Sequence, residues 1–91
     1  MYDWDDKKDA EKRAQYGFGF SEVEQVFNQA YYQEESDSYA NQYRVVGFAS
    51  TGDLVTVACE DRTDISGNEY TYLATFWKAS PSERKRYDGQ K

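Results

Sequence analysis

The stretch from Tyr70 to Tyr87 constrains the fold most, because a strong strand pattern is followed at once by a helix start. Residues 70–77 are almost all β-branched, aromatic or aliphatic, and such side chains pack well on a pleated sheet. Ser80 and Glu83 then form a capping box, and Pro81 occupies the first helical position, where its missing N–H costs nothing. We therefore predict a central strand that turns directly into a C-terminal helix.

Two helices are predicted ahead of the strands. Good helix formers fill residues 5–15, and Gly17 and Gly19 end this segment. Ser21 and Glu24 offer a capping box for a second helix, in which apolar residues recur at helical spacing. This second helix is expected to pack on the core.

The strand pattern begins after an acidic, tyrosine-bearing segment, 31–42, which has no clean period and is predicted to be a loop. Residues 43–50 and 54–60 are joined by a turn in which Gly52 occupies the position that needs a positive φ. They are therefore predicted to form an antiparallel hairpin, and 61–69 to connect it to the strand at 70–77. Strict alternation along that last strand divides its side chains into two sets, Tyr70, Tyr72, Ala74 and Phe76 on one side and Thr71, Leu73, Thr75 and Trp77 on the other.

The predicted fold class is α+β in a single domain spanning residues 1–91. A small antiparallel sheet of three to four strands forms a meander, with two N-terminal helices and one C-terminal helix covering one face. Residues 1–4 are either the fourth strand, at an edge, or an extended lead-in.

The chain is acidic, and its charge is unevenly distributed. The net charge is −6 at pH 7, but residues 14–77 carry ten acidic side chains against two basic ones, whereas 78–91 carry five basic against two acidic. Affinity for nucleic acid comes chiefly from Lys and Arg, so most of this surface would repel a phosphate backbone. Direct nucleic-acid binding is expected to be weak and confined to Arg84, Lys85 and Arg86.

No histidine is present, which removes His-based nucleophilic triads, imidazole acid–base catalysis and His metal sites. Neither a cofactor nor a metal is expected. The N-terminal acids lack the spacing of a calcium loop and suit a solvated helix end; they are Asp3, Asp5, Asp6 and Asp9. The one cysteine, Cys59, is expected to be a buried small hydrophobe. The absence of an apolar N-terminal run favours a cytoplasmic location away from membranes.

Motifs at both ends of the chain, in unbroken order, resemble those of one family. Its N-terminal pattern, Trp-Asp-x-x-Lys and then two helices, is similar to Trp4, Asp5, Lys8, Gly17, Phe20, Val26 and Phe27. Its C-terminal pattern, Ala-Ser/Thr-x-x-Glu-Arg-x-x-Tyr, is similar to Ala79, Ser80, Glu83, Arg84 and Tyr87, and a further match runs from Arg44 to Gly47. The family is BrnT, toxins of the RelE/ParE-like superfamily from type II toxin–antitoxin pairs. The resemblance implies a RelE-like sheet with packed helices.

The resemblance also implies a ribonuclease restrained by an antitoxin, but this chain differs where that activity needs cations. The family's basic residues are replaced by Gln15, Tyr16, Asp53, Tyr72 and Trp77. Cleavage of RNA by 2′-OH attack needs stabilised charge on phosphorus and a proton carrier. An active ribosome-independent mRNA ribonuclease would have to use the basic residues that remain, Lys8, Arg44, Lys78 and Arg84.

The favoured hypothesis is a non-catalytic inhibitor or accessory protein on a degenerate BrnT-like scaffold. Clustered carboxylates can act as a nucleic-acid mimic in an Arg/Lys groove, and tyrosines supply contact area at interfaces. The expected partner is a protein with a basic surface, either an antitoxin or a host defence complex that handles nucleic acid. In the second case this chain would be a phage or mobile-element protein that blocks the complex, as anti-CRISPR proteins do. The expected partner-binding residues are Tyr31, Tyr32, Glu34, Glu35, Asp37, Glu60, Asp61 and Asp64.

Two other functions stay open. The first is the active ribonuclease toxin, neutralised by its antitoxin. The second is a decoy that keeps only the surface that binds an antitoxin. Tight antitoxin binding without toxicity would separate the decoy from the toxin.

Overall fold

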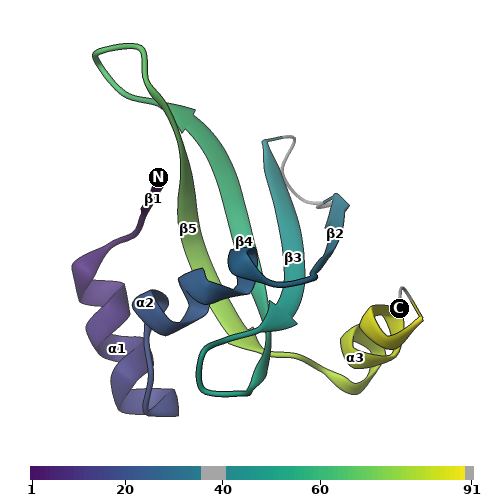
Figure 1. Cartoon of the computed structure of the whole chain (residues 1–91). Helices are drawn as coiled ribbons and strands as arrows, with labels where there is room; N and C mark the ends of the chain where they lie inside the picture. The colour runs from purple at the N-terminus through teal and green to yellow at the C-terminus, as the bar shows by residue number, and fades with distance from the viewer. Residues whose placement is uncertain (36–40, 90–91) are drawn as a thin grey trace.

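The computed structural model describes residues 1–35 and 41–89, which form an α+β fold (Figure 1). In chain order the elements are β1 (Tyr2–Asp3), α1 (Asp6–Tyr16), α2 (Phe20–Val23), the 3₁₀ helix η1 (Glu24–Asn28), β2 (Tyr32–Glu35), β3 (Gln42–Phe48), β4 (Leu54–Thr63), β5 (Glu69–Lys78) and α3 (Pro81–Asp88). In this part of the chain the five strands make one sheet in the order β1-β5-β4-β3-β2. Among the described residues only the β1–β5 pair is parallel, so the sheet is mixed and larger than the antiparallel sheet of three to four strands that the sequence predicted. None of the helices described is long and apolar enough to cross a membrane.

The predicted meander and strand-to-helix junction are confirmed. β3, β4 and β5 are consecutive antiparallel neighbours, and Gly52 turns the first hairpin at φ 90°, where a side chain would be strained. Ser80 Oγ accepts the N–H of Glu83 at 3.2 Å, and Glu83 Oε1 accepts the N–H of Ser80 at 2.8 Å. Pro81 opens α3. The N-terminal edge strand also forms, as β1.

The prediction of a loop over 31–42 is wrong at residues 32–35, which form β2, and residues 36–40 of that segment lie outside the described residues. Tyr32 pairs with Val46 and Glu35 with Tyr43, which makes β2 an edge strand. Gln and Glu have little intrinsic preference for strands, so pairing with β3 decides this conformation and local propensity does not. The connection predicted over 61–69 is also too long, since β4 continues to Thr63 and β5 begins at Glu69.

The second helix begins earlier than its predicted capping box. Gly19 is the N-cap of α2, and the Glu22 side chain accepts the Gly19 N–H at 2.9 Å. Ser21 and Glu24 therefore do not form the box. After Val23 the backbone tightens into η1, which buries Val26 in the core.

The helices cover opposite faces of the sheet, contrary to the prediction that they cover one. α1, α2 and η1 lie on what we call the helical face, where Val45 joins the main core. α3 lies on the other, which we call the α3 face, where Tyr87 packs with Val46 and Leu54. Figure 1 shows α1 and α3 well apart, with the β4–β5 hairpin extending beyond both. Residues 54–59 of β4 are all buried and, apart from Thr56, apolar, which is typical of a strand buried on both faces.

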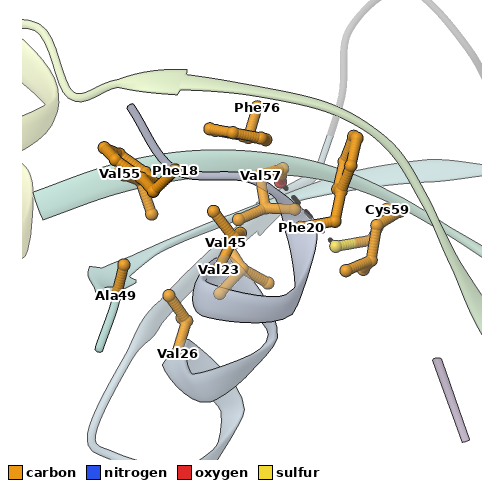
Figure 2. Close-up of a cluster of buried hydrophobic side chains, with 11 residues drawn as sticks. Phe18, Phe20, Val23, Val26, Val45, Ala49, Val55, Val57, Cys59 and Phe76 are labelled. Carbon is orange, nitrogen blue, oxygen red and sulfur yellow. Dashed lines mark hydrogen bonds between the residues drawn. The ribbon is translucent and has the colours of Figure 1, made fainter. Parts of the chain in front are cut away.

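The main core is aromatic and valine-rich (Figure 2), and Phe20 meets Phe76 edge-on at 5.0 Å between ring centroids. Cys59 is fully buried in it, as predicted. Leu73 and Phe76 both enter this core although strict alternation puts them on opposite sides. A β-bulge explains the difference, because Ala58 pairs with Thr75 but Cys59 with Leu73, which leaves Ala74 unpaired. The predicted division of β5 is therefore wrong.

Candidate functional site

Because side chains alternate along a strand, the predicted partner-binding acids of β2 and β4 lie on both faces of the sheet. On β2, Glu34 lies opposite Arg44 on the α3 face, and Glu35 lies opposite Tyr43 on the helical face. On β4, Glu60 and Asp61 divide in the same way, Asp61 lying on the helical face. A single partner surface can therefore contact only part of the predicted set.

The acids on the α3 face are paired within the molecule. Glu34 Oε1 lies 3.2 Å from Arg86 Nη2, and Glu60 Oε1 lies 2.9 Å from Arg62 Nη2. Glu60 also accepts the Gln42 side-chain amide at 2.7 Å, and these two hydrogen-bond donors, Gln42 and Arg62, hold the pKa of Glu60 below its usual value. The charges of these carboxylates are therefore already compensated within the molecule.

The predicted partner-binding acids on the helical face, Glu35 and Asp61, are not paired in this way. Among residues 1–35 and 41–89, neither Glu35 nor Asp61 has an ion-pair partner. Asp61 Oδ1 accepts a hydrogen bond from the Tyr43 hydroxyl at 2.9 Å. Burial of the ring and this hydrogen bond raise the pKa of Tyr43, so the phenol stays a neutral donor.

Two polar pockets flank Asp61. The smaller, of about 300 Å³, is lined by Glu35, Tyr43 and Asp61 together with Gln33, Asn41 and Gln42, although the side-chain amide of Gln42 is engaged by Glu60 on the α3 face. The larger, of about 420 Å³, lies toward β5 and β1, and its lining includes Tyr2, Asp61 and Glu69. Asp61 lines both pockets. We call this region the Asp61 surface and define it as Tyr2, Glu35, Tyr43, Asp61 and Glu69.

Aromatic rings border the Asp61 surface on the side of η1. Tyr2 stacks on Phe27 with 4.6 Å between ring centroids, and Phe27 meets Tyr31 edge-on at 5.6 Å. Tyr31 is 44% exposed as a residue and belongs to the predicted partner-binding set. Tyr32 instead packs against the apolar cluster beneath α3.

A further residue of the predicted set, Asp64, falls outside this site. Asp64 lies in the β4–β5 turn, where its Oδ1 accepts the N–H groups of Ser66 and Asn68, both at 2.9 Å. It therefore shapes the turn. Asp37 lies outside the described residues.

The sequence prediction did not include Tyr2, Tyr43 or Glu69, which the structure adds to the Asp61 surface. Tyr43 reaches Asp61 only because β3 and β4 pair in one register. No local pattern in the sequence predicts this register. Glu69 lies on the helical face because it is the first residue of β5 and pairs with Thr63.

The basic residues that a ribonuclease would have to use lie on both sides of the sheet. Arg44 lies on the α3 face, 5.8 Å from the centroid of the Trp77 ring. Lys78 lies on the helical face, with its Nζ 3.9 Å from Asp53 and 6.0 Å from the centroid of Tyr16. Lys8 is on α1 and Arg84 on α3, again on opposite sides (Figure 1). One scissile phosphate could not contact all four.

A part-buried hydrogen-bond network surrounds Trp77, one of the residues that the resemblance to BrnT would align with a family arginine. Trp77 Nε1 donates to Glu83 Oε1 at 3.1 Å, and the Glu83 residue is only 5% exposed. Burial alone would raise the pKa of Glu83, but hydrogen bonds from Ser80 and Trp77 outweigh it and lower that pKa. Trp77 therefore joins β5 to α3.

The N-terminal acids take part in local structure. Asp5 caps α1 by accepting the N–H groups of Lys7 and Lys8, and Asp9 Oδ1 accepts the N–H of Phe20 at 2.7 Å. Across residues 1–35 and 41–89, no group of His, Cys, Asp and Glu is arranged to hold a metal ion.

Comparison with protein-family models and with curated proteins found no match. The resemblance to BrnT therefore stays a prediction from the motifs.

Proposed function

We propose that this protein is a non-catalytic binding module whose Asp61 surface docks on a basic surface of a partner protein. The observation that carries the proposal is the contrast between the predicted partner-binding acids of β2 and β4 on the two faces. Glu35 and Asp61 have no ion-pair partner in the part of the chain described, whereas Glu34 and Glu60 on the other face have one each. Free carboxylates beside pockets form strong charge-assisted hydrogen bonds with Arg and Lys.

Electrostatics also favour this kind of partner. The segment 14–77 holds ten acidic and two basic side chains, so its field attracts cationic surfaces and repels phosphates. Tyr31 and Tyr43 beside the carboxylates supply rigid contact area of the type that dominates interface energies. A protein that binds nucleic acid through an Arg/Lys groove fits these requirements, and this chain would block that groove. We infer the role of an inhibitor, on a scaffold that resembles BrnT.

The test is affinity capture from candidate host cells with tagged wild type and two matched double variants. Glu35→Gln with Asp61→Asn removes two charges from the Asp61 surface. Asp6→Asn with Glu11→Gln removes two from exposed positions of α1. The expected result is one basic protein or complex retained by wild type and by the α1 variant but lost by the surface variant. Equal retention by all three would refute the assignment of this surface.

The ribonuclease alternative has its own test, because binding experiments would not detect it. Purified protein at micromolar concentration is incubated with mRNA, alongside Arg84→Ala and Arg44→Ala. We expect no cleavage by any of them, since these cations do not converge. Cleavage by wild type that Arg84→Ala abolishes would overturn the non-catalytic part of the proposal.

A further inference from the structure

The two pockets that meet at Asp61 specify the partner more closely than its charge does. Building on the proposed function, we infer that the partner inserts two cationic side chains of one extended segment, one into each pocket, and that the Asp61 carboxylate contacts both. The pockets lie on either side of the β4 backbone, one toward β3 and β2 and the other toward β5 and β1. Asp61 is common to both linings.

The smaller pocket has the chemistry of a guanidinium site. Glu35 and Asp61 both line it, as do two residues with amide side chains, Gln33 and Asn41. Arginine presents five N–H donors in a planar fork, and carboxylate and amide oxygens are the acceptors that can satisfy them. The volume of about 300 Å³ leaves space for a side chain rather than for a water molecule alone.

The larger pocket is lined by a second pair of acidic residues, Asp61 and Glu69, together with Thr63 and Thr71. Arg62 also lines it, but the guanidinium of Arg62 lies against the Tyr72 ring at 3.8 Å and pairs with Glu60 on the opposite face. The charge of Arg62 is therefore already compensated. A cation entering this pocket meets two carboxylates that have no ion-pair partner among the described residues.

Tyr43 acts as a positioning residue. Its hydroxyl donates to Asp61 Oδ1 at 2.9 Å, which fixes the carboxylate on the strand that separates the two pockets. Oδ2 and the remaining lone pair of Oδ1 can then accept donors from either side. Because the phenol stays protonated, this arrangement persists throughout the neutral and alkaline range in which the partner's Arg and Lys are charged.

The spacing fits an extended partner segment. Neighbouring strands lie about 4.8 Å apart, so sites on the two sides of β4 are separated by roughly 10 Å. Residues i and i+2 of an extended chain project to one side about 7 Å apart, and the long side chains of Arg and Lys span the remainder. An Arg-x-Arg sequence in extended conformation can therefore fill both pockets.

The experiment is an NMR titration of the ¹⁵N-labelled protein at low salt with the peptide acetyl-Arg-Gly-Arg-amide. Controls are the peptide with both arginines replaced by citrulline, which keeps shape without charge, and acetyl-Arg-Gly-Gly-amide. We expect the two-arginine peptide to shift the amide signals of residues 33–35, 42–43, 61–63 and 69–71. It should bind at least about tenfold more tightly than the single-arginine peptide, because the second contact is intramolecular.

Variants then locate the shared carboxylate. Asp61→Asn should weaken the two-arginine peptide about tenfold and remove its advantage over the single-arginine peptide, whereas Asp6→Asn should change neither. Tyr43→Phe keeps the charge and should weaken binding by a smaller factor. Equal affinities for the one- and two-arginine peptides, or shifts confined to other residues, would overturn the inference. If the capture experiment above still depends on Glu35 and Asp61, that failure leaves the proposed function standing.

Discussion

Glu83 is the residue whose substitution tests the structure most sharply, because it joins the last strand to the last helix. Its carboxylate, in a residue 5% exposed, accepts the Ser80 N–H at 2.8 Å and the Trp77 indole N–H at 3.1 Å. A hydrogen bond to a charged group contributes about 1.5–3 kcal/mol, and both donors are partly buried, so the lower end applies. Glu83→Ala should therefore reduce the free energy of unfolding by about 3 kcal/mol.

That loss converts into a large shift in melting temperature. The entropy of unfolding is about 2.1 cal/mol/K per residue, or about 0.19 kcal/mol/K for 91 residues, so Tm should fall by about 15 °C. Glu83→Gln keeps the volume and one acceptor oxygen and should cost about half as much. Thermal and urea unfolding followed by near-UV circular dichroism, which reports Trp77, measure both. A Glu83→Ala protein within about 1 kcal/mol of wild type would refute the role given to this carboxylate.

The same carboxylate gives a pH dependence of defined sign. The pKa of Glu83 is lower in the folded protein than its ordinary value of 4.5, because the hydrogen bonds outweigh burial. Its contribution to stability is therefore complete above pH 4.5 and is lost as the pH falls through the folded-state pKa. The stability difference between wild type and Glu83→Ala should be constant near neutrality and shrink in acid. A difference that grows in acid would contradict the assignment.

Three further predictions concern the core and the helical face. Gly47→Ala would place a Cβ 2.7 Å from Val26 Cγ1 and 3.2 Å from Tyr31 Cβ, so urea unfolding should show a loss of about 1–3 kcal/mol; an unchanged midpoint would contradict this close contact. Asp9→Ala removes the acceptor for the Phe20 N–H at 2.7 Å and should lower the free energy of unfolding by about 1–2 kcal/mol. An unchanged free energy of unfolding would show that other contacts join α1 to α2. Burial raises the pKa of Cys59 to about 12, so the thiol should resist iodoacetamide at pH 8 and react only in denaturant; rapid labelling of the native protein would show that it is accessible.

The parts of the fold that sequence could predict are those specified by neighbouring residues. The capping box of Ser80 and Glu83 and the turn at Gly52 depend on local chemistry, and both form as predicted. β2 could not be predicted, since its Gln and Glu residues adopt a strand only because β3 provides a partner. The bulge at Ala74 reverses the faces of half of β5, and a register shift of this kind leaves no signal in composition.

The candidate site shows the same division. Composition identified the acidic side chains and the tyrosines, but strand alternation decides that Glu35 and Asp61 share a surface while Glu34 and Glu60 do not. The paired acids also depend on contacts between distant segments, as Glu34 meets Arg86 from α3. The acids left without an ion-pair partner in the described residues could be identified only once the fold had placed the arginines.

The affinity of the captured partner for three purified proteins, measured at low and at high salt, tests the central claim most directly. These are wild type, Glu35→Gln with Asp61→Asn, and the matched α1 variant Asp6→Asn with Glu11→Gln. We predict that wild type and the α1 variant bind equally and weaken together as salt rises, because solvent ions screen exposed charges. The surface variant should bind at least about a hundredfold more weakly at low salt and depend less on salt. Equal affinities for all three proteins would contradict the claim that the Asp61 surface holds the partner.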